Sequence, residues 1–294
     1  MQKNRSVGGA NVRPTWVRRG TRLVGRSLEI ASRFEPIRRA LFEYYDQRSK
    51  RFMRLAPAHP FDNEYAIKTS GVLPGSVLRL GYPLKATTGR VGYLGVQPSI
   101  LRRALNILPV DSGTTFVDLG CGKGRALVVA SEFPFGSIVG VEISPELAEV
   151  ASENALVVRR NHPQRTPISV VEGDVLDYAL PPGNLVIFLF NPFEKVLITQ
   201  LLNKIEAALQ ERDSSIYVVY INPVCGHIFD GSSMLSRIYA ESLPYDPAEI
   251  GTGPDSSDTV IIWQDRKNPR VSAREGVDRR IVVTTFGMRA ELVD

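Results

Sequence analysis

The nine residues Val117 to Arg125 (V-D-L-G-C-G-K-G-R) constrain the fold of this 294-residue chain more than any other stretch. A short apolar run leads into glycines at positions 120, 122 and 124, and a helix-forming run follows. Because glycine has no side chain, such a turn lets a ligand lie across the carboxyl end of a strand. The stretch therefore predicts a strand, a ligand-binding turn and a helix, in that order.

The spacing of these glycines separates two classes of ligand. The dinucleotide fingerprint G-x-G-x-x-G would place its third glycine at position 125, where this chain has Arg125. Asp118 stands just before the turn, and a carboxylate there suits a cationic ligand and repels a pyrophosphate. The alternative interpretation is a tight turn that binds nothing, and the acidic residues after the next two strands argue against it.

Downstream of the turn, helical and strand-like patterns alternate, which is typical of a doubly wound, mostly parallel α/β sheet. Ser144 and Pro145 are an N-cap and a first helical residue for one of the helices. The apolar run at 185–190 indicates a strand buried on both faces. We expect helices at 97–108, 124–133, 144–158 and 195–210, and strands at 116–119, 137–141, 168–171, 185–190, 216–221, 235–243, 258–264 and 280–286.

Two further acidic residues stand at strand ends. Glu142 follows the second strand, where its carboxylate can accept hydrogen bonds from ribose hydroxyls. Asp174 follows the third strand, where it can accept from an exocyclic adenine amine. Either residue alone is typical of an ordinary strand end. The series of three acids after three successive strands predicts a nucleoside site with a positive charge nearby.

The fourth strand ends in Asn191, Pro192 and Phe193. Oxygen atoms at this point can accept a hydrogen bond from a target N–H, and Phe193 can pack on the substrate. Pro192 lacks an N–H and fixes the turn. We therefore predict the acceptor side of an active site here, and the competing interpretation is a simple turn before the next helix.

Over residues 95–265, these four elements resemble the motifs of class I S-adenosyl-L-methionine (SAM)-dependent methyltransferases, which have a Rossmann-like fold. The resemblance implies that Asp118, Gly120, Gly122 and Gly124 surround the methionine part of SAM, with Glu142 on the ribose and Asp174 on the adenine. The Asn191-Pro192-Phe193 segment resembles a shortened Asn/Asp-Pro-Pro-aromatic motif of amino-group methyltransferases, because it lacks one proline.

A second resemblance extends over about residues 60–225. It involves the glycine turn and, upstream of it, Phe61-Asp62, Thr69-Ser70-Gly71, Gly92-Tyr93 and Pro98. These segments look like a group of bacterial enzymes similar to Dot1-type protein lysine methyltransferases. The resemblance implies that Tyr93 and its neighbours cover SAM and belong to the catalytic site with Asn191, Pro192 and Phe193.

The charge of the chain is unevenly distributed. Residues 1–60 carry 14 Lys/Arg and 4 Asp/Glu, whereas residues 61–294 carry 22 Lys/Arg and 27 Asp/Glu. We predict four parts: a basic, partly disordered helical extension (1–60) with a break at Pro36, a connector that covers the site (61–96), the SAM-binding domain (97–265), and a C-terminal strand or tail (266–294). The basic extension is a candidate for binding an anionic partner, a nucleic acid or a membrane surface, or it is a solvated helical face.

The composition excludes several classes of protein. No apolar run is long enough to cross a membrane, and two cysteines are too few for a disulfide framework. The three histidines show no metal-ligand spacing, so we expect no metal site. A cytoplasmic location is expected, with an organelle transit peptide as the alternative reading of the Arg-rich N-terminus.

The sequence therefore predicts a methyltransferase that transfers a methyl group from SAM to a nitrogen nucleophile on protein. The alternatives are a nucleic-acid or small-molecule acceptor, or a module that binds SAM or nucleic acid without catalysis. The acceptor and the oligomeric state are left open.

Overall fold

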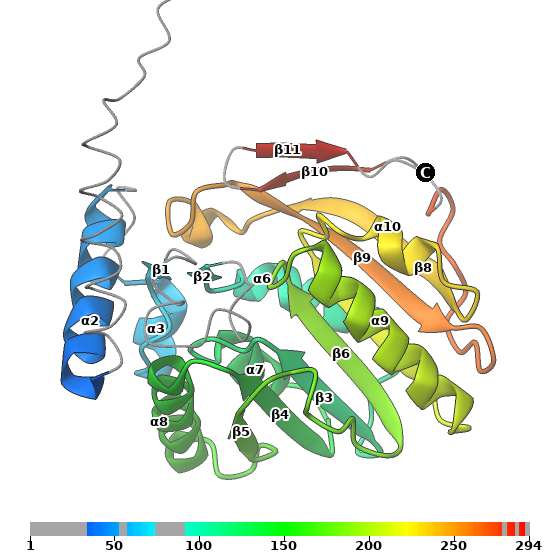
Figure 1. Cartoon of the computed structure of the whole chain (residues 1–294), viewed down its shortest axis with the longest axis horizontal. Coiled ribbons are helices and arrows are strands. Elements are labelled where there is room, and N and C mark those ends of the chain that lie inside the picture. The colour runs from blue at the N-terminus through cyan, green and yellow to red at the C-terminus, as the bar shows by residue number, and fades with distance from the viewer. Residues whose placement is uncertain (1–33, 53–57, 74–91, 278–280, 286–287, 292–294) are drawn as a thin grey trace, which may run out of the picture.

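The computed structural model describes residues 34–52, 58–73, 92–277, 281–285 and 288–291. Its centre is a seven-stranded sheet in the order β5-β4-β3-β6-β7-β9-β8 (Figure 1). The strands are β3 (Thr114–Leu119), β4 (Ser137–Glu142), β5 (Ile168–Glu172), β6 (Asn184–Phe190), β7 (Ile216–Ile221), β8 (Leu235–Pro244) and β9 (Ser257–Asp265).

The strand order reverses at β3. This strand pairs in parallel with β4 on one side and with β6 on the other, while β5 and β7 extend the two halves in parallel. The strand β9 is antiparallel to both of its neighbours, β7 and β8. In open α/β sheets, ligands bind where the order reverses, beyond the carboxyl ends of the strands. The glycine turn follows β3 at this point.

Helices cover both faces of the sheet, as Figure 1 shows. One face packs against α6 (Pro98–Leu105), α7 (Arg125–Ala130) and α8 (Pro145–Asn161). The other packs against α9 (Lys195–Gln210) and the short α10 (His227–Asp230). In β6, Leu185, Ile187 and Leu189 belong to the second core, and Val186 and Phe188 to the first. Both faces of β6 are therefore buried, as its apolar run predicted.

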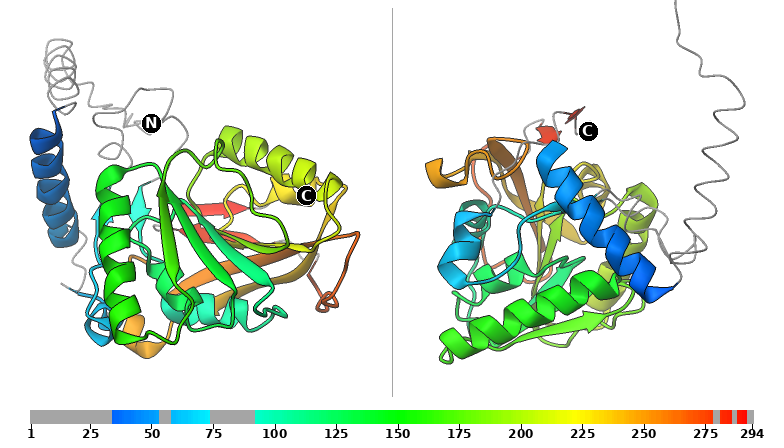
Figure 2. Two further views of the ribbon diagram at one scale, coloured as in Figure 1. Left: turned by 90° about the horizontal axis from the view of Figure 1, so that it is seen from below. Right: turned by 90° about the vertical axis from the view of Figure 1, so that its left-hand side faces the viewer.

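The segment upstream of the sheet lies against the α8 side of the molecule. Its elements are α2 (Glu35–Phe52), α3 (Pro60–Tyr65) and the antiparallel pair β1 (Val72–Leu73) and β2 (Tyr93–Leu94). Figures 1 and 2 show α2 at one side of the molecule, next to α8 and β1. Two ion pairs join α2 to α8, Arg38 with Glu146 and Arg39 with Glu149. The helix α2 therefore packs on the domain that carries the glycine turn.

The predicted order of helices and strands from 97 to 264 is confirmed, with ends that shift by a few residues. Ser144 caps α8 by accepting from the Leu147 N–H, as its sequence position predicted. The helix predicted at 124–133 is shorter and ends at Ala130. The strand predicted at 280–286 is β10 (Val282–Thr285), but it pairs with β11 (Met288–Glu291) rather than with the central sheet.

The connector, in which the sequence indicated no helix or strand, contains most of α3 and the strands β1 and β2. His59 caps α3 with its side chain, and Pro60 supplies the first residue of that helix. The break predicted at Pro36 falls on the second residue of α2, in the first turn of the helix, where a proline removes no intrahelical hydrogen bond. The predictions for residues 1–33 concern a part of the chain that the structure does not describe. None of the described helices is long and apolar enough to cross a membrane.

Candidate functional site

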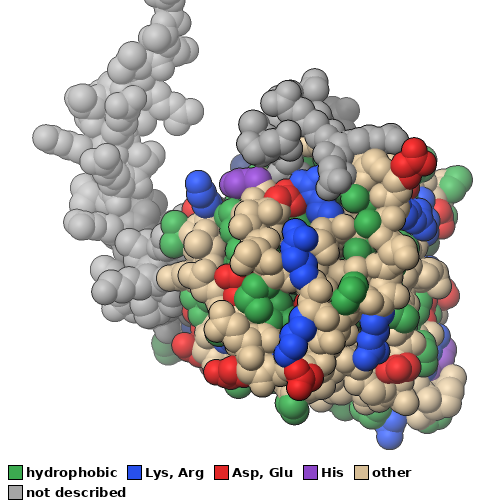
Figure 3. All heavy atoms as spheres, turned by 90° about the vertical axis from the view of Figure 1, so that its right-hand side faces the viewer, with side chains coloured by type: hydrophobic (Ala, Val, Ile, Leu, Met, Phe, Trp, Pro, Cys, Tyr) green, Lys and Arg blue, Asp and Glu red, His purple; other side chains and the backbone are tan. Residues whose placement is uncertain are grey.

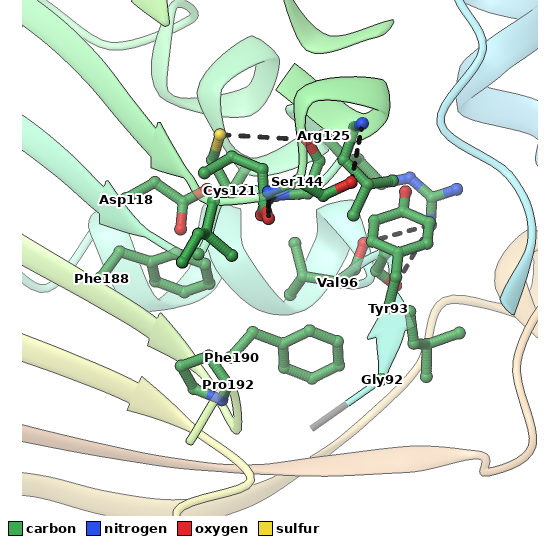
Figure 4. A pocket seen from close by; sticks show the side chains of 18 of the residues that line it. Gly92, Tyr93, Val96, Asp118, Cys121, Arg125, Ser144, Phe188, Phe190 and Pro192 are labelled. Carbon is green, nitrogen blue, oxygen red and sulfur yellow. Dashed lines mark hydrogen bonds between the residues drawn. The ribbon is translucent and has the colours of Figure 1, made fainter. Parts of the chain in front are cut away.

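A cavity opens at the switch point, beside the carboxyl ends of β3, β4 and β6 (Figure 4). Its walls come from the glycine turn, from the strand ends and from the segment around β2. It is lined by residues 92–96, 120–122 and 142–144 and by Asp118, Arg125, Ala126, Leu147, Val175, Phe188, Phe190, Pro192 and Phe193. Most of these side chains are apolar, and two carboxylates stand among them.

Asp118 is the more unusual of the two carboxylates. Its side chain is only 2% exposed, and no described residue donates a hydrogen bond to it. Burial, and then the nearby charge of Glu142, raise the pKa of Asp118 well above its usual range. A buried carboxylate without a partner is costly. The cavity is therefore arranged to receive a positive charge or a hydrogen-bond donor at this point.

Glu142 holds the glycine turn in place. Its carboxylate accepts hydrogen bonds from the Gly122 N–H and the Ser144 N–H, each at 2.9 Å. One side chain thus links the turn after β3 to the turn after β4. Glu142 also lines the cavity, so its carboxylate combines a structural role in the two turns with a place in the site.

The three glycines of the turn all have positive φ angles, of 89°, 54° and 81°. They differ in what surrounds them. A Cβ atom at Gly120 would lie 3.2 Å from Pro192, and one at Gly122 would lie 2.4 Å from the Tyr93 ring. A Cβ atom at Gly124 would meet Ala151 of α8 at 3.2 Å. Gly120 and Gly122 line the cavity, whereas Gly124 allows α7 and α8 to pack closely.

Tyr93 lies across the glycine turn, opposite the phenylalanines of β6 in Figure 4. The ring lines the cavity, and its hydroxyl donates a hydrogen bond to the Thr69 carbonyl at 2.5 Å. Burial raises the pKa of Tyr93 far above its usual value. The hydroxyl is therefore neutral and engaged, so the ring covers the cavity and the hydroxyl does not act as a base.

The segment after β6 is brought to the same cavity. Pro192 and Phe193 line it, together with Phe188 and Phe190 of the strand (Figure 4). Asn191 lies between these residues with a φ of 39°, a conformation in which asparagine is enriched. Its N–H donates to the Ile221 carbonyl at the end of β7, and its side chain is not among those that line the cavity.

Asp174 lies at the edge of the site. Its neighbour Val175 lines the cavity, but Asp174 does not. One Asp174 carboxylate oxygen accepts a hydrogen bond from the Leu176 N–H at 3.0 Å, which shapes the turn after β5. Of the ten candidate residues, the structure therefore places seven around the cavity, and Asp174, Gly124 and Asn191 beside it.

Two cations at the turn, Lys123 and Arg125, have contacts that the sequence did not indicate. Lys123 donates to the Ser70 carbonyl at 2.8 Å and forms an ion pair with Asp46 of α2 at 3.3 Å. Arg125 donates hydrogen bonds to the Thr69 hydroxyl and to the Val96 carbonyl, and it lines the cavity. The only local signal was the presence of two basic residues beside a turn that otherwise consists of small residues.

The histidines and other possible metal ligands do not gather here. His59 contacts Gln97 at 2.8 Å, and burial followed by the charge of Arg125 lowers its pKa to about 4. In the part of the chain that the structure describes, no three His, Cys, Asp or Glu residues are grouped as metal ligands.

Residues 110–211 match a protein-family model described as a methyltransferase domain. No curated protein matches this chain. Among solved structures, an RNA methyltransferase from Salinibacter ruber in complex with S-adenosyl-L-homocysteine is 17% identical, with a TM-score of 0.39 over 62% of this chain and 100% of that one. A precorrin-6y C5,15-methyltransferase from Geobacter metallireducens is 15% identical, with a TM-score of 0.41 over 58% of this chain and 87% of that one.

Proposed function

We propose that this chain, a SAM-dependent methyltransferase with a class I methyltransferase domain, transfers the methyl group to a nitrogen atom of a protein. SAM is its cofactor and supplies a methyl group that is already activated. The protein's task is then to hold the two reacting atoms in line, which can contribute roughly 7–11 kcal/mol.

The residues of the cavity fit this cofactor. Asp118 is a buried carboxylate without a hydrogen-bond partner among the described residues, and SAM carries two positive charges, on its sulfonium and its amino group. Gly120 and Gly122 leave room for the ligand beside Asp118, because glycine has no side chain at these positions of the turn. Glu142 lines the cavity, and a carboxylate there can accept hydrogen bonds from ribose hydroxyls. We assign Asp174 to the adenine, which requires its carboxylate to turn toward the cavity.

The apolar wall supports a nitrogen acceptor. Phe190, Pro192 and Phe193 stand on the β6 side of the cavity, and water is excluded where such side chains meet. An apolar environment favours the neutral form of an amine and lowers its pKa from about 10.4. A neutral amine has the free lone pair that methyl transfer needs. We assign Asn191 to orient the acceptor through its side-chain oxygen.

The ionisable groups that line the described cavity also favour nitrogen over oxygen. Asp118, Glu142 and Cys121 lie on the side of the glycine turn, which we assign to the cofactor. The Tyr93 hydroxyl donates to a carbonyl. None of these groups is placed as a base at the apolar wall. An amine needs only the loss of one proton, whereas a hydroxyl needs a base to become a strong nucleophile.

The charge of residues 61–294, which include the cavity, supports protein over nucleic acid as the acceptor. Residues 61–294 carry 22 Lys/Arg against 27 Asp/Glu, and a polyanion is bound mainly through Lys and Arg. The face shown in Figure 3 intersperses both signs of charge and shows no continuous basic stripe. A basic protein segment with a target lysine therefore complements the catalytic part better than RNA or DNA does.

Some further assignments are proposals that rest on the sequence pattern or on charge. The resemblance to Dot1-type enzymes involves segments between residues 61 and 98 together with the glycine turn, and of these the matched family model covers only the turn. We propose this relationship, the four-part division of the chain and a cytoplasmic location on the sequence pattern. The anionic partner of residues 1–60 is a proposal on charge alone.

The proposal is tested by incubating the purified protein with methyl-labelled SAM and cell extract, followed by separate protease and nuclease treatments. We expect the label to stay with protein, to survive mild alkali, and to be recovered as methylated lysine after complete hydrolysis. An ester-linked methyl group would be released by alkali, and a nucleic-acid acceptor would lose its label to nuclease. Either result would replace the protein amine as the acceptor.

The Asp118→Asn variant provides the control for background methylation by enzymes in the extract, because it keeps the shape of the side chain and removes its charge. Label that is equally strong with this variant does not come from the cavity.

A further inference from the structure

We propose that Arg125 is a positioning residue that holds the cover of the SAM cavity, residues 92–96, against the glycine turn. The proposal rests on the assignment of this cavity to SAM. Arg125 is the first residue of α7 and follows directly after Gly124. Its side chain is 5% exposed, and it is the only buried arginine in the part of the chain that the structure describes. A guanidinium buried this deeply needs a full set of acceptors.

Main-chain carbonyls supply most of these acceptors. The Arg125 side chain donates to the Thr69 carbonyl at 3.0 Å, to the Gly95 carbonyl at 3.3 Å and to the Val96 carbonyl at 3.4 Å. It also donates to the Thr69 hydroxyl at 2.7 Å, and the nearest carboxylate, Asp62, lies 3.9 Å away. The guanidinium therefore joins the segments around Thr69 and around Gly95 to the start of α7.

Thr69 carries the connection from Arg125 to Tyr93. Its carbonyl accepts from both the Arg125 guanidinium and the Tyr93 hydroxyl. Asp62 accepts from the Thr69 N–H and hydroxyl, so Thr69 is fixed from the other side as well. The Tyr93 ring is thereby set on the glycine turn, where a Cβ atom at Gly122 would come within 2.4 Å of it.

The shape of the site requires arginine. A Cβ atom at Gly95 would lie 2.6 Å from the Arg125 Cζ atom, so the cover approaches the flat guanidinium directly. Figure 4 shows Arg125 beside the Tyr93 ring, with hydrogen bonds to the cover. Lysine has three donors on one nitrogen and cannot span acceptors that arginine reaches with a planar fork.

This arrangement has a consequence for ligand exchange. SAM that lies between the turn and the cover leaves only when their contact opens, so the bonds of Arg125 set the dissociation rate. Loss of these bonds raises the population of open cover and lowers the apparent affinity. The acceptor side of the cavity, formed by Phe190 and Phe193, has no hydrogen bond to Arg125. Loss of the Arg125 bonds should therefore leave that side unchanged.

The test compares Arg125→Lys and Arg125→Met with the wild-type chain in SAM binding by calorimetry and SAM release by rapid dilution. We expect Arg125→Met to raise the SAM Kd by about tenfold or more, chiefly through faster release. Arg125→Lys should recover part of the affinity, since it restores the charge and some donors. Wild-type affinity in both variants would overturn the proposal.

A second measurement needs no ligand. Amide hydrogen exchange of residues 92–96 should be faster in both Arg125 variants, while exchange in β6 and β7 stays slow. Unchanged exchange in the cover would overturn the proposal even if affinity fell. If the wild-type chain failed to bind SAM while the cover loosened as expected, the cavity assignment would be wrong and the positioning role of Arg125 would stand.

Arg237→Lys is the matched control. Arg237 donates to Asp230 at 2.6 Å and to the Val277 carbonyl at 3.2 Å, in a region formed by α10 and β8. Its replacement removes the same kind of planar fork far from the cavity. We expect a stability loss in this variant without a change in SAM release. Equal effects of Arg237→Lys and Arg125→Lys on release would show that general stability, and not the cover, controls exchange.

Discussion

Replacing Asp118 with asparagine should change stability and SAM affinity in opposite directions. The carboxylate is 2% exposed and accepts no hydrogen bond from any described residue. Its pKa is raised in the folded chain by burial and by the charge of Glu142. A group of this kind costs stability when it is ionised, and the cost grows as pH rises above the unfolded pKa of about 3.9.

The size of the stability gain follows from the cost of a buried carboxylate that accepts no hydrogen bond from the described residues. A buried, unsatisfied polar group costs about 1–3 kcal/mol, and more when it is charged. Asp118→Asn removes the charge and keeps the volume, so the free energy of unfolding at pH 8 should rise by about 1–3 kcal/mol. The melting temperature should rise by roughly 2–4 °C per kcal/mol, as in domains of 150–250 residues.

SAM binding should weaken in the same variant. A hydrogen bond to a charged group contributes about 1.5–3 kcal/mol, so its loss raises the Kd by about 10- to 150-fold. The wild-type affinity should fall as pH decreases, because protonation of Asp118 competes with the cationic ligand. The affinity of the variant should depend much less on pH.

Thermal melts and calorimetric titrations at several pH values measure both effects. The variant should melt at a higher temperature than the wild type without SAM, and it should gain less from added SAM. The reasoning would be refuted by a variant that is less stable without ligand and binds SAM as tightly as the wild type. Asp118 would then be a structural residue with a hydrogen-bond partner.

Three further predictions follow from single positions. Gly122→Ala should destabilise the chain by about 1–2 kcal/mol because of its positive φ, and should abolish SAM binding by displacing Tyr93. Gly173→Ala is the control, since a Cβ atom there meets nothing within 4 Å, and equal effects in calorimetry would contradict the proposed contact. Asn191→Ala should leave SAM binding nearly intact and lower methyl transfer to extract protein, and a loss of SAM binding would contradict this division. Burial raises the pKa of Asp258 to about 6, so its ionisation costs about 3 kcal/mol above that pH and nothing below about pH 4. In urea unfolding, the stability gain of Asp258→Asn should therefore be larger at pH 7 than at pH 4, and an equal gain at both would exclude this cause.

Local patterns predicted most of the central domain. The apolar runs of β3, β4, β6 and β7 and the capping residues of α8 are short-range signals, so they can be recognised in the sequence. The position of β9 between β7 and β8 is different. It depends on pairing between segments far apart in the chain, and no local residue pattern specifies that order.

The same distinction holds for the site. Asp118, Glu142 and the glycines were found because they follow strands, and parallel strands bring their ends together. Asp174 follows a strand too, but a local bond to the Leu176 N–H holds its carboxylate outside the cavity lining. The contacts of Arg125 with Thr69 and Gly95 span 56 and 30 positions. Such contacts depend on tertiary packing, which explains why the sequence did not indicate them.

The most direct test of the account is a crystal structure of the chain with S-adenosyl-L-homocysteine bound. We predict the ligand between the glycine turn and the Tyr93 ring, with its amino group at Asp118 and its ribose at Glu142. The central claim is that this cavity is the cofactor site. A ligand bound elsewhere, or one whose amino group lies away from Asp118, would contradict it.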